Sequence, residues 1–209
     1  MSSATTSASP AVPSVSPDEA MERLLAGNAR YLSGNLIKRD DAAIRKQLVS
    51  EQHPFAAILS CSDSRFAPVE IFDTGIGDLF DIRVAGNVAD TDGIASIEYT
   101  VTMCGTRLIV VLGHTHCGGV AAAVAAHNGA KEAPGHIPDL IHRIRPAVEI
   151  AAGRPGDLSD TAIEENVRLS MRKITASEPI LSTGIRSGWL RVVGMVYDLA
   201  AGTIRILPD

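Results

Sequence analysis

Cysteine and histidine side chains occur at two places where the sequence predicts the end of a buried strand. Cys61 follows the apolar run 55–60, and the motif His114–Cys117 follows the apolar run 108–113. Open α/β sheets place their functional sites at the carboxyl ends of the strands. Two thiolates and one imidazole are ligands that zinc prefers, and three protein ligands leave a fourth position for water. These residues therefore predict a catalytic zinc site.

No local zinc-finger spacing explains these residues, because no second cysteine lies near Cys61. The two predicted strand ends must instead meet in space, as neighbouring strands of a doubly wound sheet do. His114 and Cys117 lie in a loop flanked by glycines, whose backbone freedom lets both side chains point to one position. His116 lies between them and is an alternative imidazole ligand that the residues alone leave open. Cys104 lies on the apolar side of a predicted helix, where burial is expected instead of metal binding.

The elements that must position these residues alternate between strands and helices. We predict strands at 55–60, 79–84, 108–113, 190–197 and 203–207, the last two forming a terminal hairpin. We predict helices between them at 93–104, 120–127, 137–151 and 160–176. This alternation predicts an α/β fold with a central, mostly parallel sheet covered by helices on both faces. We expect one domain over residues 17–209.

The N-terminal region is predicted to contain a disordered tail and two helices. Residues 1–16 are mostly Ser, Thr, Ala and Pro, with few side chains that could anchor them in a core. A helix is predicted to start at Pro17, and a second helix is expected at 41–51. The apolar face of the first helix is expected to comprise Met21, Leu24, Leu25 and Tyr31. Its segment 18–32 has no obvious place in a compact sheet.

The composition of the chain indicates which binding partners and which cellular compartment to expect. The chain has 209 residues, a net charge of -5 and no basic cluster, so neither nucleic acid nor an anionic membrane surface is an expected partner. No apolar run approaches the roughly 20 residues that span a bilayer, and we see no secretory signal. The three cysteines are an odd number, which argues against a disulfide framework and favours a reducing compartment. We therefore expect a cytoplasmic protein.

Three motifs together resemble those of the β-class carbonic anhydrases. They are Cys-Ser-Asp-Ser-Arg at 61–65, Arg-Val-Ala-Gly-Asn at 83–87 and His-Thr-His-Cys-Gly-Gly at 114–119. The resemblance runs from about residue 18 to residue 207. It implies a β-carbonic-anhydrase-like fold and a zinc enzyme that interconverts carbon dioxide and bicarbonate.

The resemblance also implies the ligand set and the assembly. Cys61, His114 and Cys117 match the family's ligands of one Zn²⁺ per chain, which favours His114 over His116. The family's smallest unit is a dimer, so a homodimer or a dimer of dimers is implied. In the family, N-terminal helices pack on the partner subunit, and we expect the same of the first two helices here.

Asp63 and Arg65 are the expected catalytic residues beside the metal. Because two thiolates cancel the charge of Zn²⁺, water at this site should be acidified less than at a three-histidine site and needs further help. An ionised Asp63 can only accept hydrogen bonds, so it would orient the attacking oxygen. Arg65 would hold Asp63 through a charge-assisted contact and keep it from becoming a fourth ligand.

Two departures from the family are visible. A subgroup of the family is regulated by bicarbonate bound to a Trp, an Arg and a Tyr beside the active site. Arg83 and Tyr197 match the Arg and the Tyr, but Ile58 stands at the Trp position, so we expect the non-regulated form. Thr74 stands where relatives often have a Gln that reaches into the cleft of the neighbouring subunit.

Two other functions share these features. Carbonyl sulfide and carbon disulfide hydrolases resemble this scaffold and would have the same metal ligands. A zinc-binding oligomeric protein without turnover is an alternative of a different class. The Asp63–Arg65 pair argues against it, because a structural zinc site usually closes with a fourth protein ligand.

Overall fold

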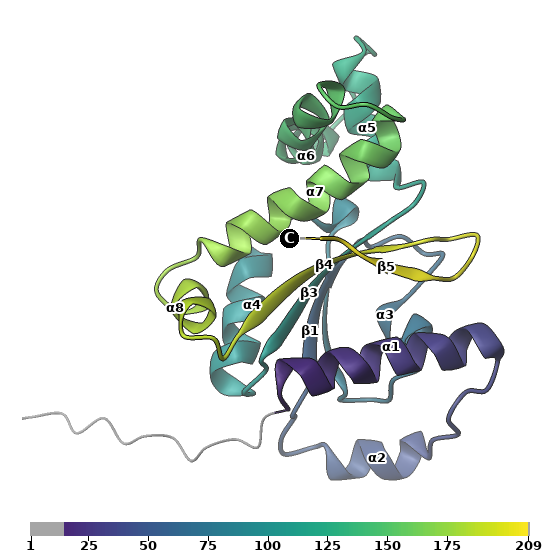
Figure 1. The fold of residues 1–209 in the computed structure, drawn as a ribbon, viewed down its shortest axis with the longest axis vertical. Helices are drawn as coiled ribbons and strands as arrows, with labels where there is room; N and C mark the ends of the chain where they lie inside the picture. The colour runs from purple at the N-terminus through teal and green to yellow at the C-terminus, as the bar shows by residue number, and fades with distance from the viewer. Residues whose placement is uncertain (1–14, 209) are drawn as a thin grey trace, which may run out of the picture.

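The computed structural model describes residues 15–208, which form a five-stranded sheet with helices on both faces (Figure 1). The strands are β1 (Ala56–Ser60), β2 (Leu79–Arg83), β3 (Leu108–His114), β4 (Arg191–Tyr197) and β5 (Ile204–Ile206). Their order is β2-β1-β3-β4-β5, and only β5 runs antiparallel, to β4. The predicted α/β fold with a mostly parallel sheet is confirmed. Residues 1–14 of the predicted tail lie outside the described residues.

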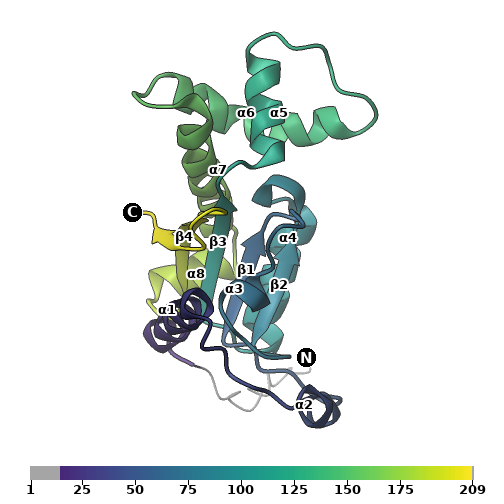
Figure 2. The ribbon, with the colours of Figure 1, turned by 90° about the vertical axis from the view of Figure 1, so that its right-hand side faces the viewer.

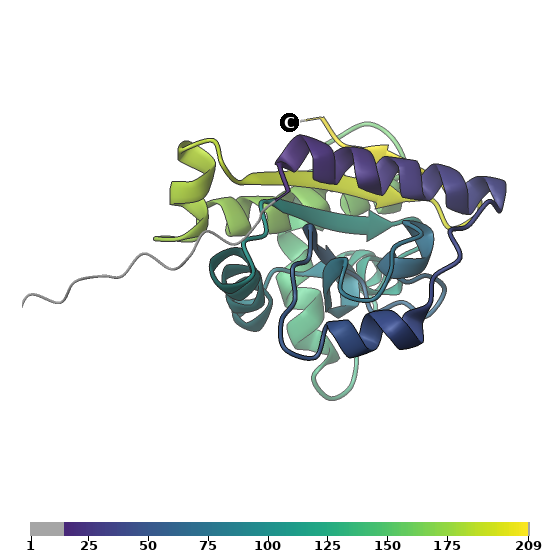
Figure 3. The same ribbon diagram turned by 90° about the horizontal axis from the view of Figure 1, so that it is seen from below.

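Helices cover both faces of the sheet. They are α1 (Pro17–Ser33), α2 (Asp41–Gln47), α3 (Pro68–Ile71), α4 (Thr91–Met103), α5 (Gly118–His127), α6 (Ile137–Ala152), α7 (Leu158–Thr175) and α8 (Leu181–Arg186), with a 3-10 turn η1 (Ala85–Asn87). The helices α1 and α3 lie on one face, and α4 and α7 lie on the other (Figures 2 and 3). The helices α5 and α6 pack with α7 beyond the strand ends. None of the described helices is long and apolar enough to cross a membrane.

Helix caps explain where the element boundaries differ from the predicted ones. The helix α4 begins two residues before the predicted start because the Asp90 carboxylate accepts a bond from the Gly93 N–H at 2.8 Å. The helix α7 begins at Leu158 because Asp157 accepts bonds from two backbone N–H groups of its first turn. The second helix ends at Gln47, before the predicted 51. The short elements α3, η1 and α8 were not predicted.

The expected apolar face of α1 is partly wrong. Leu24 is buried as expected, but Leu25 and Tyr31 are 38% and 36% exposed. The buried seam consists of Ala20, Leu24, Gly27 and Asn28. A Cβ at Gly27 would lie 1.7 Å from the Phe72 carbonyl oxygen, so α1 approaches the backbone after α3 too closely for a larger side chain.

The helix α1 packs against its own chain, whereas the sequence suggested no position for segment 18–32 in a compact sheet. The Asn28 side chain donates hydrogen bonds to the carbonyl oxygens of Ile71 and Gly202, both at 3.0 Å. These bonds tie α1 to the end of α3 and to the turn between β4 and β5. In contrast, α2 buries no residue and lies away from the sheet (Figures 1 and 2).

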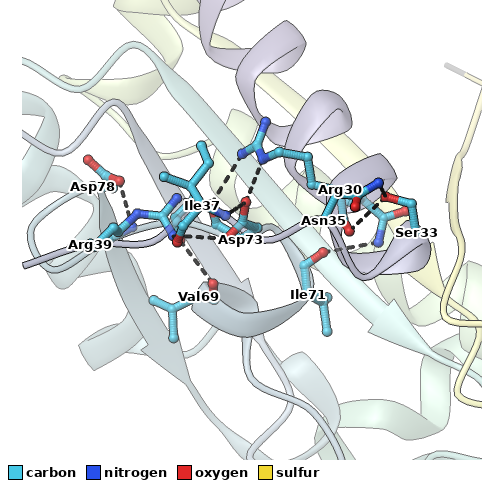
Figure 4. A network of polar contacts seen from close by, with 12 residues as sticks. Arg30, Ser33, Asn35, Ile37, Arg39, Val69, Ile71, Asp73 and Asp78 are labelled. Carbon is cyan, nitrogen blue, oxygen red and sulfur yellow. Dashed lines mark hydrogen bonds and ion pairs between the residues drawn. The ribbon is translucent and has the colours of Figure 1, made fainter.

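A buried carboxylate, Asp73, ties the N-terminal segment to the loop after α3 (Figure 4). Arg30 Nε contacts Asp73 Oδ2 at 2.5 Å, Arg39 Nη1 contacts Oδ1 at 2.8 Å, and the Ile37 N–H donates to Oδ2 at 3.2 Å. Burial by itself raises the pKa of Asp73, but the bonds from Arg39, Arg30 and Ile37 outweigh it and lower the pKa to about 2.

Replacing Asp73 with asparagine should destabilise the fold. The change leaves two arginines without their anion, and we expect a loss of ~2 kcal/mol because these arginines are partly exposed. Since the folded pKa lies below the ordinary 3.8, the stability from Asp73 is fully present above about pH 4 and is lost as the pH falls toward 2. Urea denaturation at pH 7 and pH 3 measures both effects.

The matched control for this measurement is Glu19→Gln. Glu19 pairs with Arg23 on the surface of α1, and both side chains are about half exposed. Such a pair contributes less than about 1 kcal/mol. Equal losses for Asp73→Asn and Glu19→Gln at pH 7 would contradict the anchoring role of Asp73.

Candidate active site

The sheet topology brings the two predicted strand ends together. The strands β1 and β3 are parallel neighbours, with Ser60 paired to Leu112. Cys61 directly follows β1, and His114 is the last residue of β3. Cys117 caps the N-terminus of α5. The three side chains therefore meet at the carboxyl edge of the sheet.

The ligand atoms of these residues form one compact, buried group. The atoms of Cys61, His114 and Cys117 lie within 4.8 Å of one another, and the two sulfur atoms are 4.0 Å apart. Tetrahedral zinc with Zn–S bonds of about 2.3 Å needs an S–S distance of ~3.8 Å. The side-chain positions therefore suit a zinc ion.

The orientation of His114 supports the same interpretation. His114 is fully buried, and its Nδ1 lies 2.9 Å from the Thr115 carbonyl oxygen, to which it can only donate. That bond puts the ring proton on Nδ1 and leaves a lone pair on Nε2. Nε2 has no hydrogen-bond partner among the described residues. A buried lone pair without a partner is costly, and a metal ion would satisfy it.

The protonation of the two cysteines also favours a bound cation. A hydrogen bond from Cys117 is the main cause that lowers the pKa of Cys61 to about 4, and the Gly86 N–H contributes to this lowering against the effect of burial. The same bond to Cys61, together with burial, raises the pKa of Cys117 above its ordinary value. Without a cation the pair thus keeps one proton, and a metal ion allows both thiols to ionise.

Asp63 lies beside this group and is held by Arg65. Arg65 Nε donates to Asp63 Oδ1 at 2.9 Å, and Arg65 Nη2 donates to Oδ2 at 2.7 Å. These bonds hold the pKa of Asp63 well below its usual range. Asp63 Oδ2 lies 3.9 Å from His114 Nε2. An ionised carboxylate therefore faces the metal-ligand group while the guanidinium holds it in place.

Comparisons with known proteins agree with this geometry. The family model described as carbonic anhydrase matches residues 56–204. Carbonic anhydrase 2 of Mycobacterium tuberculosis is 38% identical over 194 residues, which cover 91% of this chain and 93% of that protein. The solved structure of the β-carbonic anhydrase CafA of Aspergillus fumigatus matches with a TM-score of 0.71 and 27% identity, covering 90% of each chain. The chain belongs to the β-class carbonic anhydrase family.

The family is zinc-dependent, and its reaction is the interconversion of carbon dioxide and bicarbonate. The fold is also shared with a chain from the crystal structures of two tetrameric β-carbonic anhydrases of Sordaria macrospora, at a TM-score of 0.71 and 23% identity, over 90% of this chain and 97% of that one. The resemblance found in the sequence motifs is therefore confirmed for the family and for the fold.

His116 does not join the metal-ligand group of this carbonic anhydrase. Its side chain is exposed, and its backbone is left-handed with φ 56°. Its carbonyl oxygen instead accepts a bond from Arg65 Nη2 at 3.0 Å, so Arg65 joins the Cys61 loop to the Cys117 loop. Cys104 is buried on α4, outside the group, as expected.

One of the family's three bicarbonate-pocket positions differs here, and the structure shows what occupies each of them. Ile58 is fully buried within β1 and has no side-chain donor. Arg83 donates to the carbonyl oxygens of Cys61 at 3.1 Å and Asp63 at 2.7 Å, and so supports the loop. Tyr197 is buried, with its ring 5.2 Å from that of Phe66. The Thr74 hydroxyl donates to the Val69 carbonyl oxygen, at 3.2 Å, within its own loop.

Sequence reasoning missed two contributors to the site. The Phe66 ring lies 5.1 Å from the His114 ring and covers it. Phe66 directly follows Arg65, but a single aromatic residue in a loop has no periodic signal. The Gly86 N–H points at Cys61 Sγ at 3.2 Å. The Arg-Val-Ala-Gly-Asn motif marked this region, but no local pattern indicated that its glycine contacts a ligand.

Proposed function

We propose that this chain catalyses the reversible hydration of carbon dioxide to bicarbonate and a proton, with one Zn²⁺ per chain. The zinc ligands would be Cys61, His114 and Cys117. The observation that carries the proposal is the compact donor group with an unpaired His114 Nε2, next to a restrained carboxylate. When bound, zinc supplies a nucleophilic oxygen near neutral pH by acidifying water.

The protein's own residues would then orient the reaction. The ionised Asp63 would accept a hydrogen bond from the attacking oxygen, which would leave a lone pair of that oxygen directed at the carbon of carbon dioxide. Arg65 donates to both Asp63 oxygens and therefore prevents the carboxylate from turning toward the metal ligands. The Phe66 ring packs against the His114 ring, and the Tyr197 ring packs against Phe66, so this packing would restrain the imidazole.

The decisive experiment measures metal content and turnover on the same sample. We expect one zinc per chain and hydration of carbon dioxide by stopped-flow indicator assay. Removal of zinc with a chelator should abolish the activity, and added zinc should restore it. Zinc-loaded protein without hydration activity, or with turnover only of carbonyl sulfide or carbon disulfide, would contradict the proposal.

We also propose that residues 17–209 form one domain and that the protein works in the cytoplasm. One core includes residues from α1 to β5, which supports a single domain. Cys61 and Cys117 must stay reduced to bind zinc, and the cytoplasm maintains that state.

We further propose that two copies associate through a surface at the free edge of β2. This β2-edge surface surrounds a hollow of about 690 Å³ and includes Val49, Ile76, Leu79, Tyr99 and Met103. Val49 is 84% exposed and Met103 62% exposed, which is unusual for apolar side chains. A second copy would cover these side chains, and α2 would pack on it because none of its residues is fully buried on its own chain. A dimer of dimers would resemble the tetrameric relatives.

A charge at the β2-edge surface should weaken this assembly. We expect the unmodified protein to be a dimer or tetramer by light scattering at micromolar concentration. Met103→Asp buries a carboxylate in the interface and should raise the dissociation constant at least tenfold, about 1.4 kcal/mol. Ile137→Asp, at the exposed start of α6, is the matched control and should leave the mass unchanged. A fully active monomer would overturn the proposal.

A further inference from the structure

We propose that Asn166 and Ser170 of α7 are positioning residues for the metal site. They hold the η1 turn so that the Gly86 N–H bonds to the Cys61 thiolate. This inference rests on the proposed zinc site and extends it to a helix on the opposite face of the sheet from α1. Neither residue touches a metal-ligating atom.

The contacts between α7 and η1 are short and directed. Asn166 Nδ2 donates to the Gly86 carbonyl oxygen at 2.6 Å. The Ser170 hydroxyl donates to the Asn87 carbonyl oxygen at 2.9 Å and accepts from the Ala89 N–H at 3.2 Å. Asn166 and Ser170 are one helical turn apart and therefore lie on the same side of α7. Three hydrogen bonds thus attach this turn to one rigid helix.

The turn needs this support because its backbone is unusual. Gly86 and Asn87 both have left-handed conformations, with φ values of 67° and 44°. For asparagine this conformation is sparsely populated and persists only when neighbouring structure fixes it. A Cβ at Gly86 would lie 2.7 Å from Ile144 Cδ1, so the turn also fits tightly against α6.

The conformation of η1 determines where the Gly86 N–H points. That N–H lies 3.2 Å from Cys61 Sγ and donates to it. A hydrogen bond to a thiolate stabilises its negative charge and lowers the energy of its lone pairs. In other proteins, removal of a group that orients a metal ligand in this way weakens metal binding 10–100-fold. Asn166 and Ser170 would act on Cys61 by fixing the backbone conformation at Gly86 and Asn87.

The burial of Asn166 argues for a specific role. Asn166 and Ser170 are 1% and 2% exposed. The Asn166 Oδ1 atom has no hydrogen-bond partner among the described residues. The unpaired half of a buried amide carries a desolvation cost that an apolar side chain would not carry. The bond from Nδ2 to Gly86 is the feature that an apolar residue could not replace.

The test compares Asn166→Leu, Ser170→Ala and the conservative Ser170→Thr. Zinc affinity is measured by competition with a chromophoric chelator, and Co²⁺ is used as a spectroscopic probe of the thiolates. We expect Asn166→Leu and Ser170→Ala to bind Zn²⁺ 10–100-fold more weakly. Their sulfur-to-cobalt charge-transfer band should move to longer wavelength, because a thiolate without its hydrogen bond gives up an electron more easily. Ser170→Thr keeps the hydroxyl and should retain most of the affinity.

Thr100→Val is the control for a simple loss of stability. Thr100 is fully buried on α4 and shares a 2.8 Å hydrogen bond with Thr106, which bonds to the Pro54 carbonyl oxygen before β1. That bond lies at the end of β1 away from Cys61. Thr100→Val should unfold at lower urea concentration, with zinc affinity and cobalt spectrum unchanged.

The outcomes separate this inference from the proposed function. Wild-type zinc affinity and an unshifted cobalt band in Asn166→Leu would overturn the positioning role while leaving the zinc site intact. If Asn166→Leu does not fold, the same two measurements on Ser170→Ala decide. An unmodified protein that binds neither Zn²⁺ nor Co²⁺ through cysteine would overturn both proposals.

Discussion

Replacing Cys61 with serine is expected to abolish zinc binding and, with it, the hydration of carbon dioxide. The serine hydroxyl stays protonated near neutral pH, so one of the two anionic ligands is lost. Cys117 and His114 alone would leave the metal with two protein ligands. Loss of an outer-shell partner already costs 10–100-fold in affinity, so loss of a ligand should cost more than about 100-fold.

The chain offers a matched control in its third cysteine. Cys104 is as buried as Cys61 but lies on the other side of the core, at the end of α4. Cys104→Ser should keep one zinc per chain and near-normal turnover. Metal analysis after dialysis and stopped-flow assays on both variants make the comparison. Stoichiometric zinc in Cys61→Ser would disprove the ligand assignment.

Replacing Asp63 with asparagine should remove most of the activity while zinc stays bound. Asparagine has nearly the same size, but its amide nitrogen donates where the carboxylate oxygen only accepts. The attacking oxygen would then lose its orientation, and the Arg65 guanidinium would face an amide. We expect kcat/KM to fall by roughly 10²–10⁴-fold, which is typical of a positioned proton-handling group.

Zinc content distinguishes this effect from damage to the site. Asp63 is not among the three residues of the buried group that could hold a metal ion, so Asp63→Asn should retain one zinc per chain. Asp92→Asn, at an exposed position on α4, serves as the control for a change of charge alone. Wild-type hydration rates in Asp63→Asn across the pH range would rule out the proposed role.

Much of the local structure was determined by the sequence itself. The apolar runs before Cys61 and in 108–113 predicted the two buried strands, because a strand covered on both faces needs apolar side chains throughout. The Ser16–Pro17 pair predicted the start of α1, where the Ser16 hydroxyl accepts the Glu19 N–H at 3.2 Å. Since parallel strands end at the same edge of a sheet, Cys61 and the His114–Cys117 loop were expected to meet.

The residues by themselves left open which histidine faces Cys61, and the tertiary structure brings His114 to it, the histidine that the family resemblance implied. His114 is the last residue of the buried strand β3 and is itself buried, whereas His116 follows in a left-handed turn and is exposed. The buried seam of α1 was likewise decided by close contact with the Phe72 backbone, which selects a small residue at Gly27 over the larger apolar ones. Neither result follows from hydrophobic periodicity.

The contacts by which α7 supports Cys61 join segments that are far apart in the sequence. Asn166 bonds to the Gly86 carbonyl 80 residues away, and the N–H of Gly86 bonds to Cys61, 25 residues earlier. Patterns in a sequence report the repeat of a helix or strand and the chemistry of its caps, because these depend on neighbours within a few residues. Single hydrogen bonds between distant segments leave no such repeat, so only the folded chain shows which polar residues meet.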